Sequence, residues 1–278
     1  MAIVLALAAA MTYGAADFLG GAASRRASTA TVVIVSQLAG LVVLLAALPF
    51  FGGRLSRADL ILGVACGLCG AFAITTLYAA LATGRMGIVS PITAVVAAAL
   101  PVLVGLGLGE RPTLAAQAGV ALALVAVVLV STNDRTGRFS LGEPGIKLAL
   151  VSGLGMGALF VLLSRSTHDS GLWFLVPMRV TSLLVMFAWS LVRAQLRRPQ
   201  REVLATMLFA GIVDMAANVI YVLATRAGML IIVAVITALY PAATVLLARA
   251  VLKERLTRLQ WGGVAGAAAA VVLIASRS

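Results

Sequence analysis

ITAVVAAALPVLVGLGLGERPTLAAQAGVALALVAVVLVS, residues Ile92–Ser131, decides the fold because a second copy follows later in the chain. The copy, ITALYPAATVLLARAVLKERLTRLQWGGVAGAAAAVVLIAS, starts at Ile236. The two copies share these positions: Ile92-Thr93-Ala94 with Ile236-Thr237-Ala238, Glu110-Arg111 with Glu254-Arg255, Thr113 with Thr257, Gly119 with Gly263, and Leu129 with Leu273. Each copy is an apolar run, a short charged break and a second apolar run. A chain that repeats such a unit is expected to consist of two similar halves.

The composition places the chain in a membrane. Of its 278 residues, 62% are hydrophobic and only 11% are charged, with a mean hydropathy of +1.12. Soluble domains carry about 25% charged residues, so a water-facing globule could not bury this much apolar surface. The net charge of +12 comes from Lys and Arg in short breaks between apolar runs. Membrane topology and anionic headgroups explain this pattern, so we expect a lipid bilayer as partner and no nucleic acid.

The apolar runs predict an all-α integral membrane protein, because a span needs about 20 apolar residues. About ten runs qualify: 3–22, 30–50, 60–81, 87–108, 113–131, 146–165, 171–192, 202–225, 229–250 and 259–276. No loop is long enough for a soluble domain. The polar stretch Thr132–Pro144 separates the halves and predicts two repeats, 1–132 and 145–278.

Five spans in each half predict that the repeats are inverted. After five crossings the chain re-enters from the other side, so similar halves must have opposite orientations about a pseudo-two-fold axis in the membrane plane. The early parts of the halves agree with this pairing: Ile3 falls on Ile146, Gly14 on Gly157, and Tyr78 on Tyr221.

The basic residues bear on the orientation. Loops on the N-terminal side carry six of them: Arg54, Arg57, Arg111, Arg165, Arg226 and Arg277. The other side carries thirteen: Arg25, Arg26, Arg85, Arg135, Arg138, Lys147, Arg193, Arg197, Arg198, Arg201, Lys253, Arg255 and Arg258. The positive-inside rule therefore places both termini outside.

Small residues at helical spacing predict close packing between membrane helices. Four pairs show it: Gly63 with Gly67, Gly105 with Gly109, Gly153 with Gly157, and Gly262 with Gly266. We expect them to hold helices of one subunit together. A dimer contact through one pair is the alternative, so the chain is expected to be a monomer or a weak homodimer.

Three charged residues stand out inside apolar spans: Asp17, Arg179 and Asp214. Each costs at least about 2.5–3.5 kcal/mol on insertion scales and is expected to face an interior cavity or a partner. Polar residues share helix faces with these charges or with each other. These stripes are Asp214-Asn218-Tyr221-Thr225, Tyr13-Asp17, Thr75-Tyr78 and Thr237-Tyr240-Thr244. We expect the stripes to converge on a common interior that binds a polar or amphipathic solute.

Structural roles are alternatives for several of these residues. Asp214 and Arg179 can simply neutralise each other, and Asp17 can be a solvated residue near a span end. Gln37, which matches Arg179 in the other half, fits either a helix–helix hydrogen bond or a cavity wall. Glu110 fits a structural role at the membrane surface, such as capping the next helix.

Proline and cysteine add no separate chemistry. Pro91, Pro101 and Pro241 predict kinks, which serve either as gates or as packing features. The Cys66-Cys69 pair has the spacing of a metal or redox motif, but no second ligand pair exists, so we expect two packing residues.

We expect no metal and no cofactor. An ionisable group at bilayer depth motivates the hypothesis of proton coupling through Asp214. The sequence contains no H-E-x-x-H or G-x-S-x-G pattern, so we do not expect an enzyme.

Three segments resemble the EamA family of the drug/metabolite transporter superfamily. They are YGAADFLGGAASRR (13–26), GERPTLAAQAG (109–119) and KERLTRLQWGG (253–263), and the resemblance in span pattern covers nearly the whole chain. It implies a carrier of the cytoplasmic membrane, often an exporter of amino acids or other small metabolites, that works by alternating access. It also implies that both termini are in the cytoplasm, contrary to the charge count.

The function predicted is a secondary transporter, an exporter of small metabolites in a bacterial cytoplasmic membrane. The residues expected to line its cavity are Asp214, Arg179, Asn218, Tyr221, Tyr13, Asp17, Tyr78, Thr237 and Tyr240. A channel or a non-transporting membrane protein remains the alternative.

Overall fold

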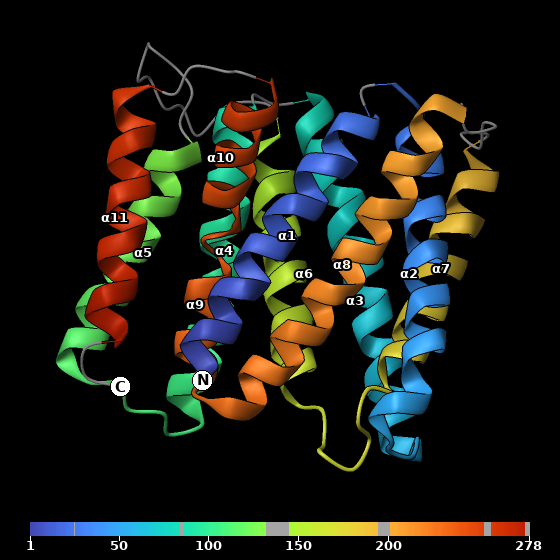
Figure 1. Ribbon diagram of the computed structural model, residues 1–278, viewed down its shortest axis with the longest axis horizontal. Helices are drawn as coiled ribbons and strands as arrows, with labels where there is room; N and C mark the ends of the chain where they lie inside the picture. The colour runs from blue at the N-terminus through green and yellow to red at the C-terminus, as the bar shows by residue number, and fades with distance from the viewer. Residues whose placement is uncertain (25, 84–85, 132–144, 194–200, 253–256, 276–278) are drawn as a thin grey trace.

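A computed structural model describes residues 1–24, 26–83, 86–131, 145–193, 201–252 and 257–275 (Figure 1). The helices assigned in these ranges are α1 (Ala2–Ser24), α2 (Thr29–Phe51), α3 (Arg57–Thr83), α4 (Met86–Gly107), α5 (Leu114–Ser131), α6 (Ile146–Ser164), α7 (Leu175–Val192), α8 (Arg201–Ala227), α9 (Leu230–Thr237), α10 (Tyr240–Leu252) and α11 (Arg258–Ala275).

The helices account for the ten predicted spans. Eight stretches within the described ranges are long and apolar enough to cross a membrane, and one of them, Leu230–Val251, combines α9 and α10. Two shorter apolar stretches, Ile92–Gly107 and Leu114–Val130, lie in α4 and α5. Large apolar side chains such as those of Val4, Leu154 and Leu184 are exposed, as expected of a surface that faces lipid. The prediction of an all-α integral membrane protein is confirmed.

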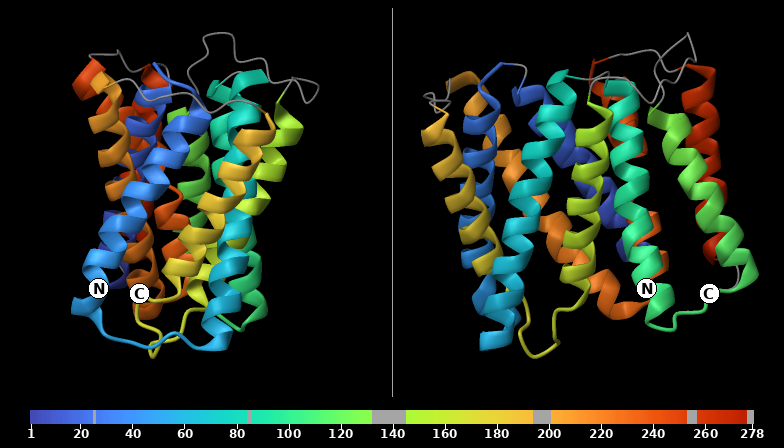
Figure 2. Two further views of the ribbon diagram at one scale, coloured as in Figure 1. Left: turned by 90° about the vertical axis from the view of Figure 1, so that its right-hand side faces the viewer. Right: turned by 180° about the vertical axis from the view of Figure 1, so that it is seen from behind.

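The two halves are inverted repeats. In Figure 1, α1 starts at the lower face and runs upward, whereas α6, its counterpart, starts at the upper face and runs downward. The packing has the same symmetry: α1 packs on α8 and α6 on α3, α2 packs on α8 and α7 on α3, and α5 packs on α11 (Figure 2). The inverted arrangement is confirmed. The repeat boundaries at 132 and 145 stay a prediction, because residues 132–144 lie outside the described part.

The repeated E-R-x-T motif starts a helix in each half. The hydroxyl of Thr113 accepts a hydrogen bond from the N–H of Ala116 (3.3 Å), which caps the N-terminus of α5. Thr257 does the same for α11 through the N–H of Gln260 (3.2 Å), and the Gln260 side chain accepts in return from the N–H of Thr257 (2.9 Å). The reciprocal pair at α11 is a capping box. The threonine cap that both copies share explains why threonine stands at this position of each.

The glutamate of the same motif joins the two repeats. The Glu110 carboxylate accepts hydrogen bonds from the N–H groups of Leu230 (2.7 Å) and Ile231 (2.9 Å) at the start of α9. The prediction that Glu110 caps the next helix, α5, is therefore wrong, because Glu110 caps α9 of the other half. A negative charge there also complements the α9 dipole. Glu254, its counterpart, lies outside the described residues.

Several of the small-residue pairs hold helices of the same chain together. A Cβ atom at Gly67 would lie 2.7 Å from the Cβ of Thr181 on α7, so only glycine permits this approach of α3 to α7. Gly153 and Gly157 are similarly tight against α4. Gly262, in contrast, has open space beside it. These contacts are the close packing expected where apolar lipid supplies no hydrophobic drive between helices.

The ninth span is interrupted, whereas its counterpart is continuous. Helix α9 ends at Thr237 and α10 starts at Tyr240. Pro241 lacks the N–H that would bond the Thr237 carbonyl in a continuous helix, so the chain turns there. Helix α4 carries Ala97 at the equivalent position and stays helical, even across Pro101. Of these two prolines, Pro241 is the one that coincides with a break.

Candidate functional site

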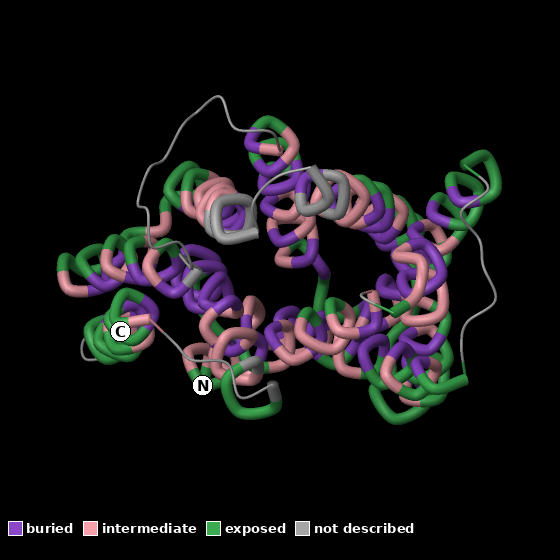
Figure 3. Tube along the Cα trace, turned by 90° about the horizontal axis from the view of Figure 1, so that it is seen from above, coloured by how far each residue is buried: buried purple, intermediate pink, exposed green. Residues whose placement is uncertain are grey.

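A cavity lies between the two repeats, about halfway along their helices. The empty space within it amounts to about 800 Å³, including the part open to solvent. Seen from above, helices of both repeats surround this centre (Figure 3). The lining residues are Tyr13, Asp17, Gln37, Cys66, Gly67, Gly70, Ile74, Ala97, Met156, Leu159, Phe160, Met178, Arg179, Ser182, Asp214, Asn218 and Tyr240.

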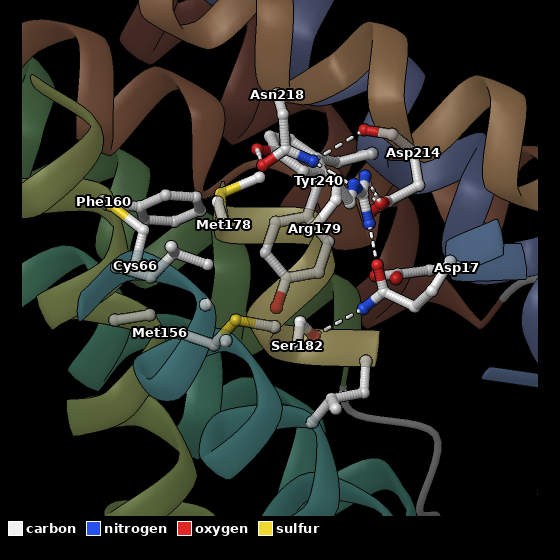
Figure 4. Close-up of a pocket in the computed structure, with 17 residues that line it drawn as sticks. Asp17, Cys66, Met156, Phe160, Met178, Arg179, Ser182, Asp214, Asn218 and Tyr240 are labelled. Atoms are coloured by element: carbon white, nitrogen blue, oxygen red, sulfur yellow. Dashed lines mark hydrogen bonds and ion pairs between the residues drawn. The ribbon is translucent and has the colours of Figure 1, made fainter. Parts of the chain in front are cut away.

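An ion pair between neighbouring helices forms the centre of the polar wall. The Arg179 guanidinium on α7 pairs with the Asp214 carboxylate on α8 and also donates a hydrogen bond to the Gln37 side-chain oxygen on α2. Its Nε donates to the Met215 sulfur at 3.1 Å. The Arg179 side chain is only 5% exposed, whereas that of Asp214 is 37% exposed. The pair therefore neutralises a buried cation while its carboxylate faces the cavity (Figure 4).

Hydrogen bonds extend this polar wall in both directions. The Asn218 amide donates to the Asp214 backbone carbonyl (2.7 Å), and the Tyr13 hydroxyl donates to the Asn218 side-chain oxygen (3.2 Å). On the other side, the Gln37 amide donates to the Ser182 hydroxyl (2.9 Å). The network joins α1, α2, α7 and α8. Gln37 thus serves both roles left open by the sequence, as a helix–helix hydrogen bond and as part of the cavity wall.

Asp17 is the third charged residue that lines the cavity. It lies on α1 one turn after Tyr13, and its side chain is exposed although it stands in a membrane span. Within the described ranges, the Asp17 carboxylate makes no hydrogen bond or ion pair. It lies among the cavity-lining residues, about two turns before the end of α1 at Ser24. The described lining residues carry two carboxyl groups and one guanidinium, a formal net charge of −1.

The opposite wall is apolar and aromatic. Met156, Leu159 and Phe160 of α6 line it together with Cys66 of α3. In the view of Figure 4, Phe160, Cys66 and Met156 lie away from Asp17 and Asp214. Such side chains would hold the apolar part of a solute while the polar wall orients the rest.

The two walls are related by the internal repeat. The alignment that puts Gly14 on Gly157 also puts Tyr13 on Met156 and Asp17 on Phe160. Equivalent positions are thus polar in the first half and apolar in the second. Polarity alone did not identify Met156 and Phe160 as candidates, but their alignment with the polar stripe of α1 could have.

Three predicted residues do not contribute a described side chain to the lining. Tyr221 is buried behind the apolar wall, where its ring stacks on Phe160 at 4.8 Å between centroids and its hydroxyl donates to the Phe160 carbonyl (3.3 Å). Thr237 is also buried away from the cavity, at the break between α9 and α10, and its hydroxyl has no hydrogen-bond partner among the described residues. The side chain of Tyr78 lies outside the described part of the structure.

The bundle is closely packed around the α6–α7 loop, which lies at the face that carries both termini (Figure 1). One buried apolar cluster includes Leu163 of α6, Leu172 and Phe174 of the loop, and Tyr221 of α8. At the surface below it, the guanidinium of Arg226 donates hydrogen bonds to the Ser166 hydroxyl (3.2 Å) and to the carbonyls of Thr167 (2.6 Å) and Gly171 (2.8 Å). These contacts fasten the end of α8 to the α6–α7 loop.

The groups that line the cavity are suited to binding a solute. Among the residues that the structure describes, no group of three or more His, Cys, Asp or Glu side chains could hold a metal ion. Cys66 and Cys69 are free thiols. The polar and apolar walls offer hydrogen bonds, charge and apolar surface to a solute.

A half-open cavity of mixed polarity, enclosed by inverted membrane-spanning repeats, is the architecture of a membrane transporter. The chain belongs to the EamA-like transporter family, whose model matches residues 1–132 and 143–276. The resemblance seen in the sequence is thereby confirmed.

Comparison with solved structures supports the fold. One protein of known crystal structure is similar to this chain with a TM-score of 0.82 at 16% sequence identity, covering 99% of this chain and 96% of that chain. At this identity the likeness shows the fold alone. A comparison with curated proteins found no match.

Proposed function

We propose that the protein is a secondary transporter that exports a small metabolite across a bacterial cytoplasmic membrane by alternating access. The observation that carries this proposal is the cavity between inverted repeats, which has an exposed carboxylate in its lining and a packed apolar cluster beside it. Inverted repeats that bind a solute at their interface can rock against each other and expose it to either side.

The packing at the face that carries both termini argues for a carrier over a channel. A channel needs a path that is open to both sides at once, whereas the apolar cluster around Phe174 and the contacts of Arg226 hold helices together at that face. Opening that face requires α8 to separate from the α6–α7 loop, which is a conformational step of the kind that limits carriers.

Counterflow in proteoliposomes tests the proposal. Vesicles that contain the purified chain are loaded with an unlabelled solute, and the uptake of the same labelled solute is followed. A carrier shows saturable uptake that internal solute accelerates. Conductance that rises linearly with voltage and does not saturate would instead establish a channel. A solute chosen from a metabolite library by thermal-shift screening serves as the first substrate.

Proton coupling, if present, is expected at a cavity carboxylate. The sequence favours Asp214 for this role, but its carboxylate is already paired with the Arg179 guanidinium. Asp17 has no such partner among the described residues and is therefore the better candidate. Uptake driven by a pH gradient is to be compared for wild type, Asp17→Asn and Asp214→Asn. Loss of coupling in Asp214→Asn alone would return the role to Asp214.

The subunit is proposed to act as a monomer embedded in the lipid bilayer. Gly63 and Gly67 are occupied by contacts within the chain, as are Gly153 and Gly157. Gly262 and its neighbourhood on α11 remain available for a weak homodimer contact. Crosslinking of Gly262→Cys in native membranes, compared with the parent chain that carries only Cys66 and Cys69, distinguishes the two states.

A further inference from the structure

We infer that the cavity selects organic cations with an apolar body, and that Asp17 is the group that binds their charge. This inference names the substrate class of the cavity and therefore rests on the proposed function. Three independent features of the cavity support it: the balance of its charges, the distribution of its polarity, and its aromatic side chains.

The charge balance leaves one carboxylate without a counterion. Arg179 is matched by Asp214, since the two form an ion pair inside the bundle. Asp17 lines the same cavity, is exposed, and makes no ion pair or hydrogen bond within the described residues. A carboxylate at bilayer depth is costly unless water or a cation compensates it. An anionic solute would add a second uncompensated charge, whereas a monocation would bring the cavity to neutrality.

The Arg179 guanidinium is poorly placed to bind an anionic solute. Arg179 already donates to Asp214, Gln37 and Met215, and its side chain is only 5% exposed. A substrate carboxylate would have to displace these partners to reach it. The positive charge of Arg179 is therefore already paired within the protein. The charged group left without a described partner is the Asp17 carboxylate.

The polarity of the walls sets the shape of the ligand. Asp17 stands on α1 at the position that Phe160 occupies in the inverted repeat on α6, so charge and apolar surface lie on opposite walls. A solute that spans the cavity meets a carboxylate with one end and Phe160, Met156 and Leu159 with the other. A cation with an aromatic or aliphatic body satisfies both ends, while a small hydrophilic solute satisfies only one.

Aromatic rings in the lining favour a cation further. Tyr13 and Tyr240 line the cavity with Asp17, and the rings of Tyr13 and Phe160 lie 5.9 Å apart at their centroids. The face of an aromatic ring attracts a cation within about 6 Å of its centroid, most effectively where water is excluded. Alkylated ammonium groups, which donate few or no hydrogen bonds and accept none, are recognised by this combination of a carboxylate and aromatic faces.

Three probes of similar size test the inference. They are benzyltrimethylammonium, whose charge is permanent, phenylacetate, which is an anion, and benzyl alcohol, which is neutral. Each is titrated by calorimetry, at one neutral pH, into the full chain embedded in nanodiscs. The variants are Asp17→Asn, Asp17→Glu as the conservative rescue, and Tyr221→Phe as a control behind the cavity wall. Thermal unfolding of each variant confirms that it is folded.

The expected result is that wild type binds benzyltrimethylammonium at least about tenfold more tightly than phenylacetate. Asp17→Asn is expected to weaken cation binding by at least about tenfold, with little change for benzyl alcohol, and Asp17→Glu to restore it. Tighter binding of phenylacetate, no binding of the cation by wild type, or unchanged cation affinity in Asp17→Asn would each overturn the inference.

Counterflow of the same cation separates this inference from the proposed function. If the cation binds at Asp17 but shows no counterflow, the inferred ligand class would stand and the proposal of a carrier would be rejected. If the chain does not bind the cation but shows saturable counterflow of neutral or anionic solutes, the proposal of a carrier would stand. The inferred ligand class would then be rejected.

Discussion

Removing one partner of the Arg179–Asp214 pair is expected to have unequal effects on stability. Asp214→Asn leaves the buried guanidinium without a counterion, and breaking a buried pair in this way costs about 3–5 kcal/mol. Because Asp214 is 37% exposed to the cavity, water there recovers part of the loss, and we expect about 2 kcal/mol. Arg179→Met leaves only the partly exposed carboxylate, which cavity water can hydrate, and is expected to cost about 1 kcal/mol.

The double variant Arg179→Met/Asp214→Asn decides whether the two residues act as a pair. If they do, its free energy of unfolding is expected to be close to that of Arg179→Met alone, an interaction energy of about 2 kcal/mol. The assay is equilibrium unfolding in mixed micelles with increasing dodecyl sulfate, followed by tryptophan fluorescence. Asp17→Asn is the matched control, because it removes an unpaired carboxylate from the same cavity and is expected to change stability by less than about 0.5 kcal/mol. Equal effects of the two single variants, or a double variant equal to their sum, would refute the reasoning.

Three further predictions concern groups outside the ion pair. Glu110→Gln weakens the cap on α9 and is expected to lower the free energy of unfolding by about 1 kcal/mol in the same micelle assay; no loss would mean that the cap does not stabilise α9. Gly63→Ala places a Cβ atom against α7 and is expected to destabilise by about 1–3 kcal/mol, whereas Gly21→Ala, which has open space beside it, is expected to be neutral or to stabilise by about 0.5–1 kcal/mol. Similar melting temperatures for the two glycine variants would contradict the packing described for α3. Tyr221→Phe removes one hydrogen bond to the Phe160 carbonyl and is expected to cost about 1 kcal/mol without changing the affinity of a cavity ligand; a change in affinity would place Tyr221 in the binding surface.

Most of the fold could be predicted because it follows from one-dimensional patterns. Apolar runs of span length give the helices, and the repeat of Ile92–Ser131 at Ile236 gives the inverted arrangement. The break between α9 and α10 was less accessible, since Pro101 and Pro241 look alike in the sequence and only one of them interrupts a helix. Whether a proline interrupts its helix depends on tertiary packing, and the positions of prolines in the sequence do not reveal that packing.

The polar wall was predictable for the same reason, because charged residues in apolar spans are costly wherever they do not serve a site or a partner. Asp17, Asp214 and Arg179 do line one cavity. Periodicity cannot say how deep a residue lies, however, so Tyr221, two turns beyond Asp214 on the same face, was placed in the cavity although it stands behind Phe160. The partner of Glu110 was also hidden, because it belongs to the other repeat.

The single proline of the ninth span gives the two repeats different mechanical properties. Under the proposed alternating access, a second state would form if each repeat took the shape that the other has now. Here that exchange would require α4 to turn at Ala94, where Ala97 still has the amide hydrogen that Pro241 lacks. It would also require α9 and α10 to join into one continuous helix across Pro241, which has no N–H to donate the helical hydrogen bond. If the protein alternates between two states as proposed, these states would therefore differ in energy before any solute binds, and one side of the membrane would be favoured at rest.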